Sequence, residues 1–285
     1  MSHPGQPTQT KSPRAARGRW HPLVQGIPDP WAVEWGHDEF GVYQTFQVGE
    51  VVQRLRWVPA GTFFMGSPES EVGRWDDEQL YQVTLTHGFW MGETPCTQAL
   101  WEAVMGHNPS QFKHADRPVE TVSWKDCQNF LEALERRVPG LHARLPTEAE
   151  WEYACRGGTT AATWAGDLKP GEEWGRAAAL EDIAWYDKNS QVNGTQPVKG
   201  KRPNPLGLFD MLGNVLEWCS DWFAEQYDLD TVVDPTGPPS GAGRVLRGGS
   251  WGSIARDVRA ADRNALDPAV GDDGVGFRLV RGPLK

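Results

Sequence analysis

Apolar and polar residues alternate along several short stretches of the chain, as they do in strands that bury one face. Residues 51–58 alternate in this way, and a Pro-Ala-Gly turn leads from them into residues 62–66. Residues 81–86 follow the same pattern. Near the C-terminus, the stretches RVLRGGSW and VGFRLVR also predict strands.

Two segments begin like helices and continue with apolar residues at helical spacing. Thr97 can cap a helix over residues 98–105, because its hydroxyl accepts a hydrogen bond from a free N–H of the first turn. Ser123 and Asp126 have the spacing of a capping box, which predicts a helix over residues 124–137.

A third helix is predicted in the stretch LPTEAEWEYACRGG, with Thr147 as N-cap, Glu150 at the capping-box position and Gly157 at the end. Glu148, Glu150 and Glu152 could be catalytic carboxylates. Acidic residues in a first turn more often complement the helix dipole, so we favour the structural interpretation.

Residues 158–205 are rich in Gly, Asn, Asp and Pro, which predicts long loops attached to a modest sheet. Strands separated by few helices indicate an α+β fold. The chain has 285 residues, of which 39% are hydrophobic and 15 are Trp, enough for one globular domain over residues 19–285. Residues 1–18 hold few apolar side chains and predict a disordered tail.

The net charge of -10 and the isoelectric point near 5.2 argue against nonspecific binding to nucleic acid or to an anionic membrane. The sequence has no apolar run suited to a signal peptide or a membrane span, so we expect no membrane insertion and a cytoplasmic location. Surface display by another export route stays an alternative.

The 4 cysteines, Cys96, Cys127, Cys155 and Cys219, are far apart and form no CxxC pair. This spacing fits neither a zinc knuckle nor a small disulfide-stapled domain. We therefore expect buried free thiols.

Residues 252–274 lie between two well-defined motifs, RGGSW and VGFRLV, and have an unusual composition. They include no Glu, Lys, Gln, Met or Trp and are rich in small and acidic residues. One explanation is a surface turn, where Gly and Asp supply the backbone conformations that turns need. The other explanation is that some process has limited the residue types that can occur in residues 252–274.

The chain resembles the formylglycine-generating enzyme (sulfatase-modifying factor) family, which has a C-type-lectin-like fold. The resemblance covers about residues 56–281 and implies an irregular, loop-rich α+β domain with little regular secondary structure. It rests on motifs that occur in the same order: GTFFMGS, ETPCTQALWEAVMGHNPSQF, RPVETVSWKDCQNFLEAL, RLPTEAEWEYACRGG, NPLGLFDMLGNVLEWCSDW, RVLRGGSW and VGFRLVR.

The resemblance suggests copper-dependent oxidation of a substrate cysteine to formylglycine as one possible activity. That reaction uses a cysteine pair shortly after the GGS motif, because thiolates bind monovalent copper. Here no Cys follows Cys219, so we expect neither copper nor this activity. A related branch, the sulfoxide synthases, binds iron largely through histidines of an additional N-terminal domain. We expect no such domain and no iron site here, because the 7 His lie between His3 and His142 without an HxxxH pair on a predicted helix.

The chain is most similar to a third branch, the variable proteins of diversity-generating retroelements. There, mutagenesis of template adenines turns AAY codons into NNY codons, which cannot encode Glu, Lys, Gln, Met or Trp. On this resemblance, Ala255, Arg256, Val258–Ala261, Arg263 and Pro268 are fixed. The candidate variable, ligand-binding positions are Gly252, Ser253, Ile254, Asp257, Asp262, Ala265, Leu266, Val270, Asp272, Asp273 and Gly274.

This resemblance predicts a ligand-binding protein whose partner, a protein or another macromolecule, binds the C-terminal variable surface. Because that surface carries mainly small and acidic side chains, the partner is basic or the binding is weak. The alternatives are an oxidase and a non-catalytic accessory protein of the family.

The family resemblance also implies a structural calcium ion beside the GNVLEW motif. Its ligands would be the carboxylates of Asp210 and Glu217 and the carbonyls of Gly213 and Val215, and an all-oxygen set suits calcium. Solvated carboxylates are the alternative. A second site would involve Asp182 and the carbonyl of Ile183.

Overall fold

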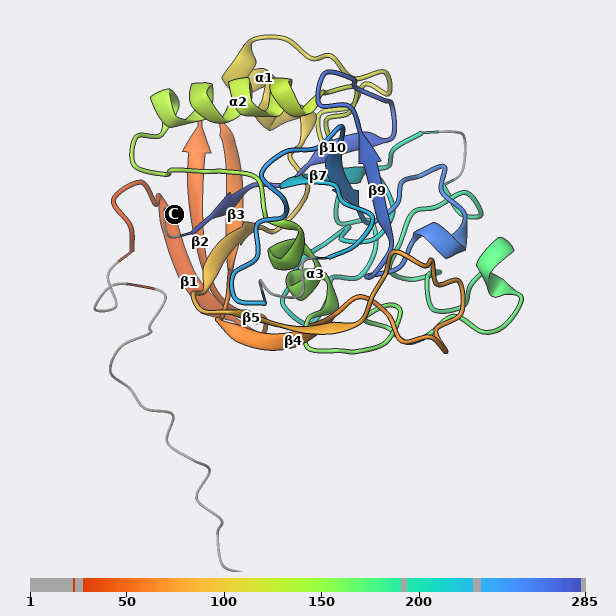
Figure 1. The fold of residues 1–285 in the computed structure, drawn as a ribbon. Helices are drawn as coiled ribbons and strands as arrows, with labels where there is room; N and C mark the ends of the chain where they lie inside the picture. Colours follow the sequence, from red (N-terminus) through yellow and green to blue (C-terminus); the bar gives the residue numbers. More distant parts are fainter. Residues whose placement is uncertain (1–22, 24–27, 191–193, 228–231, 283–285) are drawn as a thin grey trace, which may run out of the picture.

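Two sheets and a two-stranded pair form the framework of the molecule (Figure 1). The computed structural model describes residue 23 and residues 28–190, 194–227 and 232–282, so the predicted tail, residues 1–18, lies outside the described residues. The first sheet has the order β1-β2-β3-β6-β11, the second the order β10-β7-β8-β9, and β4 pairs with β5. The strands are β1 (Glu34–Asp38), β2 (Gly41–Val48), β3 (Val51–Val58), β4 (Gly61–Met65), β5 (Tyr81–Leu85), β6 (Phe89–Gly92), β7 (Leu216–Trp222), β8 (Arg244–Arg247), β9 (Arg263–Leu266), β10 (Val275–Phe277) and β11 (Val280–Arg281).

The predicted helices are confirmed with their caps. α1 (Gln98–Met105) follows Thr97, whose side chain accepts from the N–H of Leu100. α2 (Trp124–Arg137) and α3 (Glu148–Arg156) each begin at a complete capping box. Short 3-10 helices lie at η1 (Glu172–Trp174) and η2 (Ala255–Asp257).

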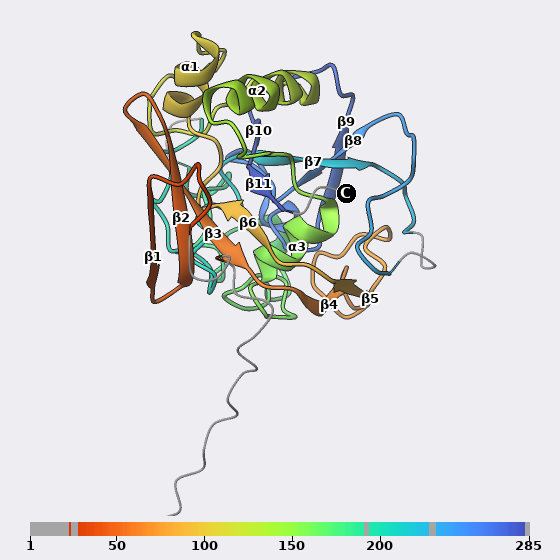
Figure 2. The same ribbon diagram turned by 90° about the vertical axis from the view of Figure 1, so that its left-hand side faces the viewer.

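Two hydrophobic clusters hold these elements together. In one, α1 and α2 pack on the first sheet and on β7 and β10, and the ring of Trp101 stacks on that of Phe130 with centroids 5.1 Å apart. In the other, α3 packs among β4, β5, β7 and β8 around the buried Trp151. Figures 1 and 2 show α1 and α2 together at the top and α3 in the middle of the strands.

The strands predicted at residues 51–58, 62–66 and 81–86 are observed as β3, β4 and β5, and the two predicted C-terminal stretches contain β8, β10 and β11. The sequence pattern did not predict β6, since all its residues are buried and it shows no alternation. The few helices and long loops confirm the loop-rich α+β class. None of the described helices is long and apolar enough to span a bilayer.

Candidate binding surface

Residues 252–274 are tied to one strand, β7, at both ends. Before the segment, Arg247 of β8 pairs with Glu217 of β7 in antiparallel register. After it, Gly276 of β10 pairs with the same Glu217 in parallel register. In the middle, Arg263 of β9 pairs with Arg247, so the segment returns once to the sheet. Figure 1 shows η2 and β9 on the right-hand side of the molecule.

Two glycines turn the chain out of β8 and into the segment. Gly248 and Gly249 have φ values of 97° and 71°, in the left-handed region that favours glycine. A Cβ on Gly249 would also lie 2.6 Å from the carbonyl oxygen of Asp257. The RGGSW motif therefore sets the geometry with which the segment begins.

The positions identified as fixed lie mostly inside the protein. Ala255, Val258, Ala260 and Ala261 have no exposed area, and Arg259 is equally buried. Buried side chains with this little free space tolerate few replacements. The fixed positions thus form the inner side of the segment.

The Arg259 guanidinium anchors the segment to the loop that precedes β5. Its Nη atoms donate to both carboxylate oxygens of Glu78, at 2.8 and 2.5 Å, and to Glu71 at 2.8 Å. Although burial acts in the opposite direction, the hydrogen bonds and charge of Arg259 hold the pKa of Glu78 below its ordinary value. Burial raises the pKa of Glu71.

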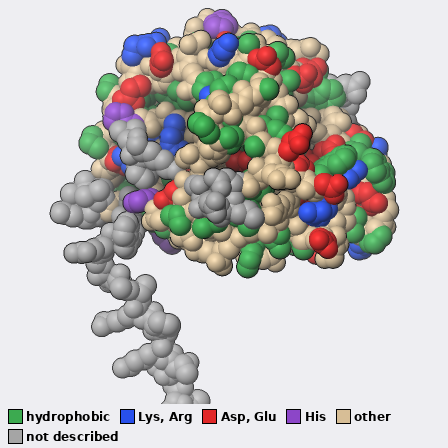
Figure 3. Space-filling model, viewed as in Figure 1, with side chains coloured by type: hydrophobic (Ala, Val, Ile, Leu, Met, Phe, Trp, Pro, Cys, Tyr) green, Lys and Arg blue, Asp and Glu red, His purple; other side chains and the backbone are tan. Residues whose placement is uncertain are grey.

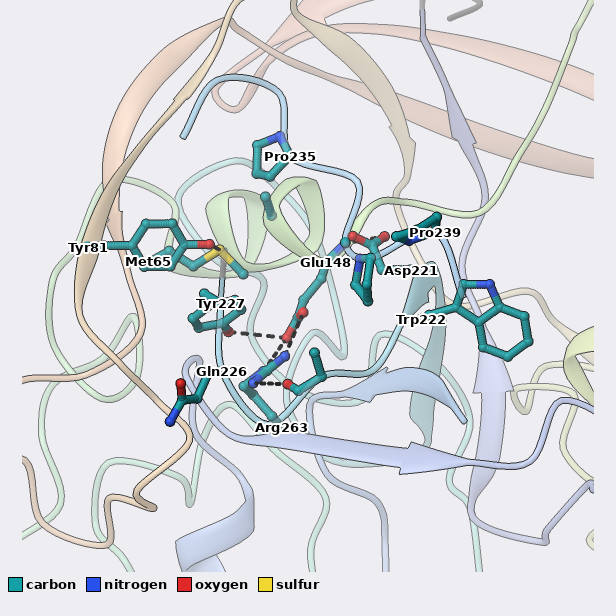
Figure 4. A pocket seen from close by; sticks show the side chains of 14 residues that line it. Met65, Tyr81, Glu148, Asp221, Trp222, Gln226, Tyr227, Pro235, Pro239 and Arg263 are labelled. Atoms are coloured by element: carbon teal, nitrogen blue, oxygen red, sulfur yellow. Dashed lines mark hydrogen bonds and ion pairs between the residues drawn. The ribbon is translucent and has the colours of Figure 1, made fainter. Parts of the chain in front are cut away.

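Arg263 is a second buried anchor, and it binds the start of α3. Its guanidinium donates to Glu148 at 2.7 and 3.2 Å and to the carbonyl oxygens of Asp77 and Ala224. Tyr227 also donates to Glu148. Figure 4 shows these side chains converging from α3, β9 and the loop after β7.

Two further arginines attach the segment through main-chain carbonyls. Arg247 donates at 2.9 Å to the carbonyl oxygens of Ala260 and Ala261 and forms an ion pair with Glu152. Arg256 donates to the carbonyl oxygens of Gly73 and Arg74. The guanidinium of Arg256 also lies 3.3 Å from the ring centroid of Trp75, a close cation–π contact.

Most candidate variable positions lie at least partly at the surface. Gly252, Val270 and Asp272 are exposed. The half-buried candidates are Ser253, Ile254, Asp257, Ala265, Leu266 and Asp273.

Two candidates do not suit a display position. Gly274 is buried where the chain enters β10, and its carbonyl oxygen accepts from the N–H of Leu216. A Cβ there would lie 3.1 Å from the Ser250 hydroxyl oxygen. Asp262 is only 3% exposed. Its side chain instead lines a cavity, together with residues from other parts of the chain.

That cavity has a volume of about 420 Å³ and lies beside β9. It is lined by Trp75, Asp77, Phe223, Asp257, Asp262, Arg263, Asn264 and Ala265. A second cavity of about 540 Å³ shares Trp75 and Asp77 with it and is also lined by Arg74, Asp76, Glu225, Gln226 and Arg256. We call these two adjoining cavities the acidic groove. Figure 3 shows acidic side chains gathered on the right-hand side, where Figure 1 places η1 and η2.

The sequence did not predict that Trp75, Asp77 and Phe223 would line this groove. They come from the loop before β5 and from the residue that follows β7, far from residues 252–274 along the chain. The one sequence signal of a surface role for Trp75 is that it stands among charged neighbours. In the structure its side chain is 42% exposed.

A third cavity of about 220 Å³ lies behind Arg263 and is lined by Met65, Tyr81, Tyr227, several prolines and the buried Asp221 (Figure 4). Burial and the nearby Glu148 carboxylate raise the pKa of Asp221 to about 7. Asp221 accepts hydrogen bonds from the N–H of Glu148 and the hydroxyl of Ser220.

The three glutamates in the first half of α3 all bind arginines, in addition to their place near the helix N-terminus. Glu148 binds Arg263, and Glu152 binds Arg247 and Arg156. Glu150 completes the capping box and binds Arg144. Each has arginine partners, so α3 is the base to which the C-terminal segment is attached.

The predicted calcium ligands fit a calcium site poorly. Both carboxylate oxygens of Glu217 accept from the Arg278 guanidinium, at 2.8 to 3.1 Å, and one accepts from the indole of Trp151. Burial raises the pKa of Asp210 to about 6. A guanidinium therefore already neutralises Glu217. Asp182, of the second predicted site, lies 3.9 Å from Arg202.

The cysteines are confirmed as buried free thiols. Burial raises the pKa of each: Cys155 reaches about 12, and Cys96, Cys127 and Cys219 lie well above the ordinary value. These thiols are therefore protonated at neutral pH and poor nucleophiles. Among the described residues, no cluster of three or more His, Cys, Asp or Glu side chains could hold a metal ion.

A family model for the sulfatase-modifying factor enzyme 1-like domain matches residues 39–283. The chain is 38% identical over 195 residues to the formylglycine-generating enzyme of Streptomyces coelicolor, covering 64% of this chain and 58% of that protein. It is 32% identical over 207 residues to the Bos taurus enzyme, covering 70% and 53%. The chain thus spans little more than half the length of these relatives.

Two solved structures share the fold over nearly their whole length. Treponema denticola variable protein 1 superimposes with a TM-score of 0.74 at 33% identity, covering 85% of this chain and 99% of that one. PvdO from Pseudomonas aeruginosa superimposes with a TM-score of 0.72 at 26% identity, covering 84% and 98%. The fold predicted from the resemblance, C-type-lectin-like and loop-rich, is confirmed.

Proposed function

The chain belongs to the sulfatase-modifying factor enzyme 1-like family, and we propose that within it the protein is a ligand-binding variable protein of a diversity-generating retroelement. Its C-terminal segment presents exchangeable side chains on a C-type-lectin-like scaffold, and its partner is a protein or another macromolecule. The likeness to Treponema denticola variable protein 1 supports this branch of the family.

The observation that carries the proposal is the division of residues 252–274 into an inner and an outer side. The alanines at the fixed positions are buried. The arginines there are buried or half-buried and attach the segment through ion pairs and contacts to main-chain carbonyls. Most candidate variable positions lie between them with exposed area. Because the backbone is fixed from inside, outer side chains can change without unfolding the protein.

The genomic DNA offers a direct test. We expect a near-copy of the codons for residues 252–274, differing at adenines, close to a reverse transcriptase gene. A complete genome with neither would refute the retroelement origin.

A library tests the display property separately. The exposed candidates Gly252, Val270 and Asp272 are randomised with NNY codons, and a matched library randomises Ala255, Val258 and Ala260. After surface display on yeast and brief proteolysis, most members of the first library should survive and most of the second should not. Equal survival would contradict the division into scaffold and display positions.

The oxidase alternative has weaker support. The named relatives are formylglycine-generating enzymes, but all 4 thiols of this chain are buried and their pKa values raised, which disfavours a thiolate site for copper. Copper-dependent oxidation of a cysteine-containing peptide by the purified protein would establish this alternative.

A further inference from the structure

Asp262 is a buried carboxylate with unmet hydrogen-bonding capacity. It is 3% exposed and lines the 420 Å³ cavity of the acidic groove. Within the described residues its carboxylate accepts no hydrogen bond, and the nearest cation, Arg259, lies 3.8 Å away. That guanidinium is already committed to Glu78 and Glu71. A buried carboxylate in this state is costly unless a partner satisfies it.

Asp77, from the loop before β5, lines the same cavity, and its side chain is 25% exposed. Its nearest cation is Arg263 at 3.8 Å, and the Arg263 guanidinium donates to Glu148 and to two main-chain carbonyls. Asp257 adds a third carboxylate to the lining. Burial raises the pKa of Asp257, although the hydrogen bond with the Trp75 side chain acts in the opposite direction. The lining thus holds more carboxylates than its one guanidinium, Arg263, can neutralise.

The remaining walls are suited to the stem of a long basic side chain. Trp75 and Phe223 contribute aromatic surface, and Ala265 leaves room at the edge of β9. Lys and Arg side chains pack their methylene groups on such surfaces while their charged ends reach polar groups. A volume of about 420 Å³ is within the usual range of ligand sites.

We propose that this cavity accepts a Lys or Arg side chain of the protein ligand, with Asp262 at its floor and Asp77 at its side as hydrogen-bond acceptors. This inference rests on the proposed function and specifies its partner as a basic protein surface. Asp262, which does not suit a display position, acts here as the selectivity residue of the groove.

Titration of the full chain with small analogues tests the cavity alone. The probes are n-butylguanidinium, n-butylammonium and the neutral n-butylurea, followed by amide resonances in two-dimensional NMR. Both cations should give saturable shifts around Asp262 and Asn264, and n-butylurea should not. Asp262→Asn should weaken cation binding about tenfold, because an amide cannot take the negative charge that pairs with a bound cation.

Two variants serve as controls. Asp77→Asn should also weaken cation binding, so the inference can still be tested if Asp262→Asn perturbs folding. Asp267→Asn changes an exposed aspartate of the same segment outside the cavity and should bind like the unmodified protein. Equal shifts with n-butylurea, or unchanged binding in both cavity variants, would overturn the inference.

A peptide selection separates this inference from the proposed function. Random peptides displayed on phage are selected on the full chain and then tested against Gly252→Trp and Ala265→Trp. Binders that are sensitive to these changes and need a basic residue support both ideas. If the binders are sensitive to these changes but need no basic residue, only the proposed cation-binding cavity is refuted. If the binders are insensitive to both changes, the proposed function is contradicted as well.

Discussion

Replacing Arg259 by Met removes the cation that joins the C-terminal segment to the loop before β5. Arg259 has no exposed area and donates to two buried carboxylates, those of Glu78 and Glu71. The methionine keeps much of the volume but leaves both carboxylates without their partner. Removing one member of a buried ion pair costs about 3–5 kcal/mol. We expect Arg259→Met to lower the free energy of unfolding by this amount at pH 7.

The loss should depend on pH in a defined direction. In the unmodified protein the pKa of Glu78 is lowered. The contribution of Glu78 to the free energy of unfolding is therefore fully present above its unfolded-state pKa and is lost as pH falls through its folded-state pKa. Without Arg259, burial raises the pKa of Glu78. Ionisation of Glu78 then destabilises the variant once the pH rises above the unfolded-state pKa. The difference between the two proteins should therefore shrink between pH 7 and pH 4.

Urea unfolding followed by Trp fluorescence at both pH values measures these differences. Arg202→Met is the matched control, since the Arg202 side chain is 62% exposed and lies 3.9 Å from an exposed aspartate. It should change stability by less than about 0.5 kcal/mol. A loss below about 1 kcal/mol for Arg259→Met, or a loss that does not vary with pH, would refute the role of Arg259 as a buried anchor.

Further predictions concern the display positions, the entry turn, the third cavity and calcium. Joint replacement of Asp272 and Asp273 by Ala should leave thermal melting nearly unchanged, and a large drop would contradict their assignment to the display side. Gly249→Ala should destabilise the protein by about 1–3 kcal/mol in urea titrations, because its φ of 71° is strained for alanine; a neutral effect would argue against the turn as a constraint. The pKa of Asp221 is raised to about 7, so stability should fall as pH rises from about 4 to 7, and Asp221→Asn should flatten this profile; an unchanged profile would show that another group is responsible. Addition of chelator and then of excess calcium should not shift the melting temperature if Arg278 alone neutralises Glu217, whereas a clear upward shift with calcium would favour the predicted metal site.

Local signals in the sequence were enough to predict the three α-helices and some of the strands. Caps at Thr97, Ser123 and Thr147 depend on neighbouring residues only, so their positions follow from the sequence. β6 is buried on both faces, and β9 is short and partly polar, so neither shows the alternation that marks a strand. The fold itself was predicted from an ordered set of motifs rather than from periodicity.

The candidate site could be predicted only in its C-terminal half. The separation of fixed and variable positions within residues 252–274 came from a resemblance, and burial agrees with it except at Asp262 and Gly274. The groove also needs Trp75 and Phe223, which tertiary packing brings to the segment from distant loops. No local sequence pattern predicts that Trp75 and Phe223 lie beside residues 252–274, because this depends on where the buried arginines attach the segment to the rest of the protein.

The attachment of residues 252–274 to one strand, through Arg247 on one side of Glu217 and Gly276 on the other, has a consequence for chain length. The ends are held a fixed distance apart by sheet hydrogen bonds, so an insertion beyond β9, near Val270 and Gly271, need not move either end. Doubling the length of a flexible loop costs only about 0.6 kcal/mol in closure entropy. Relatives and engineered versions of this protein could therefore enlarge their contact area by lengthening the segment there, as well as by exchanging its side chains.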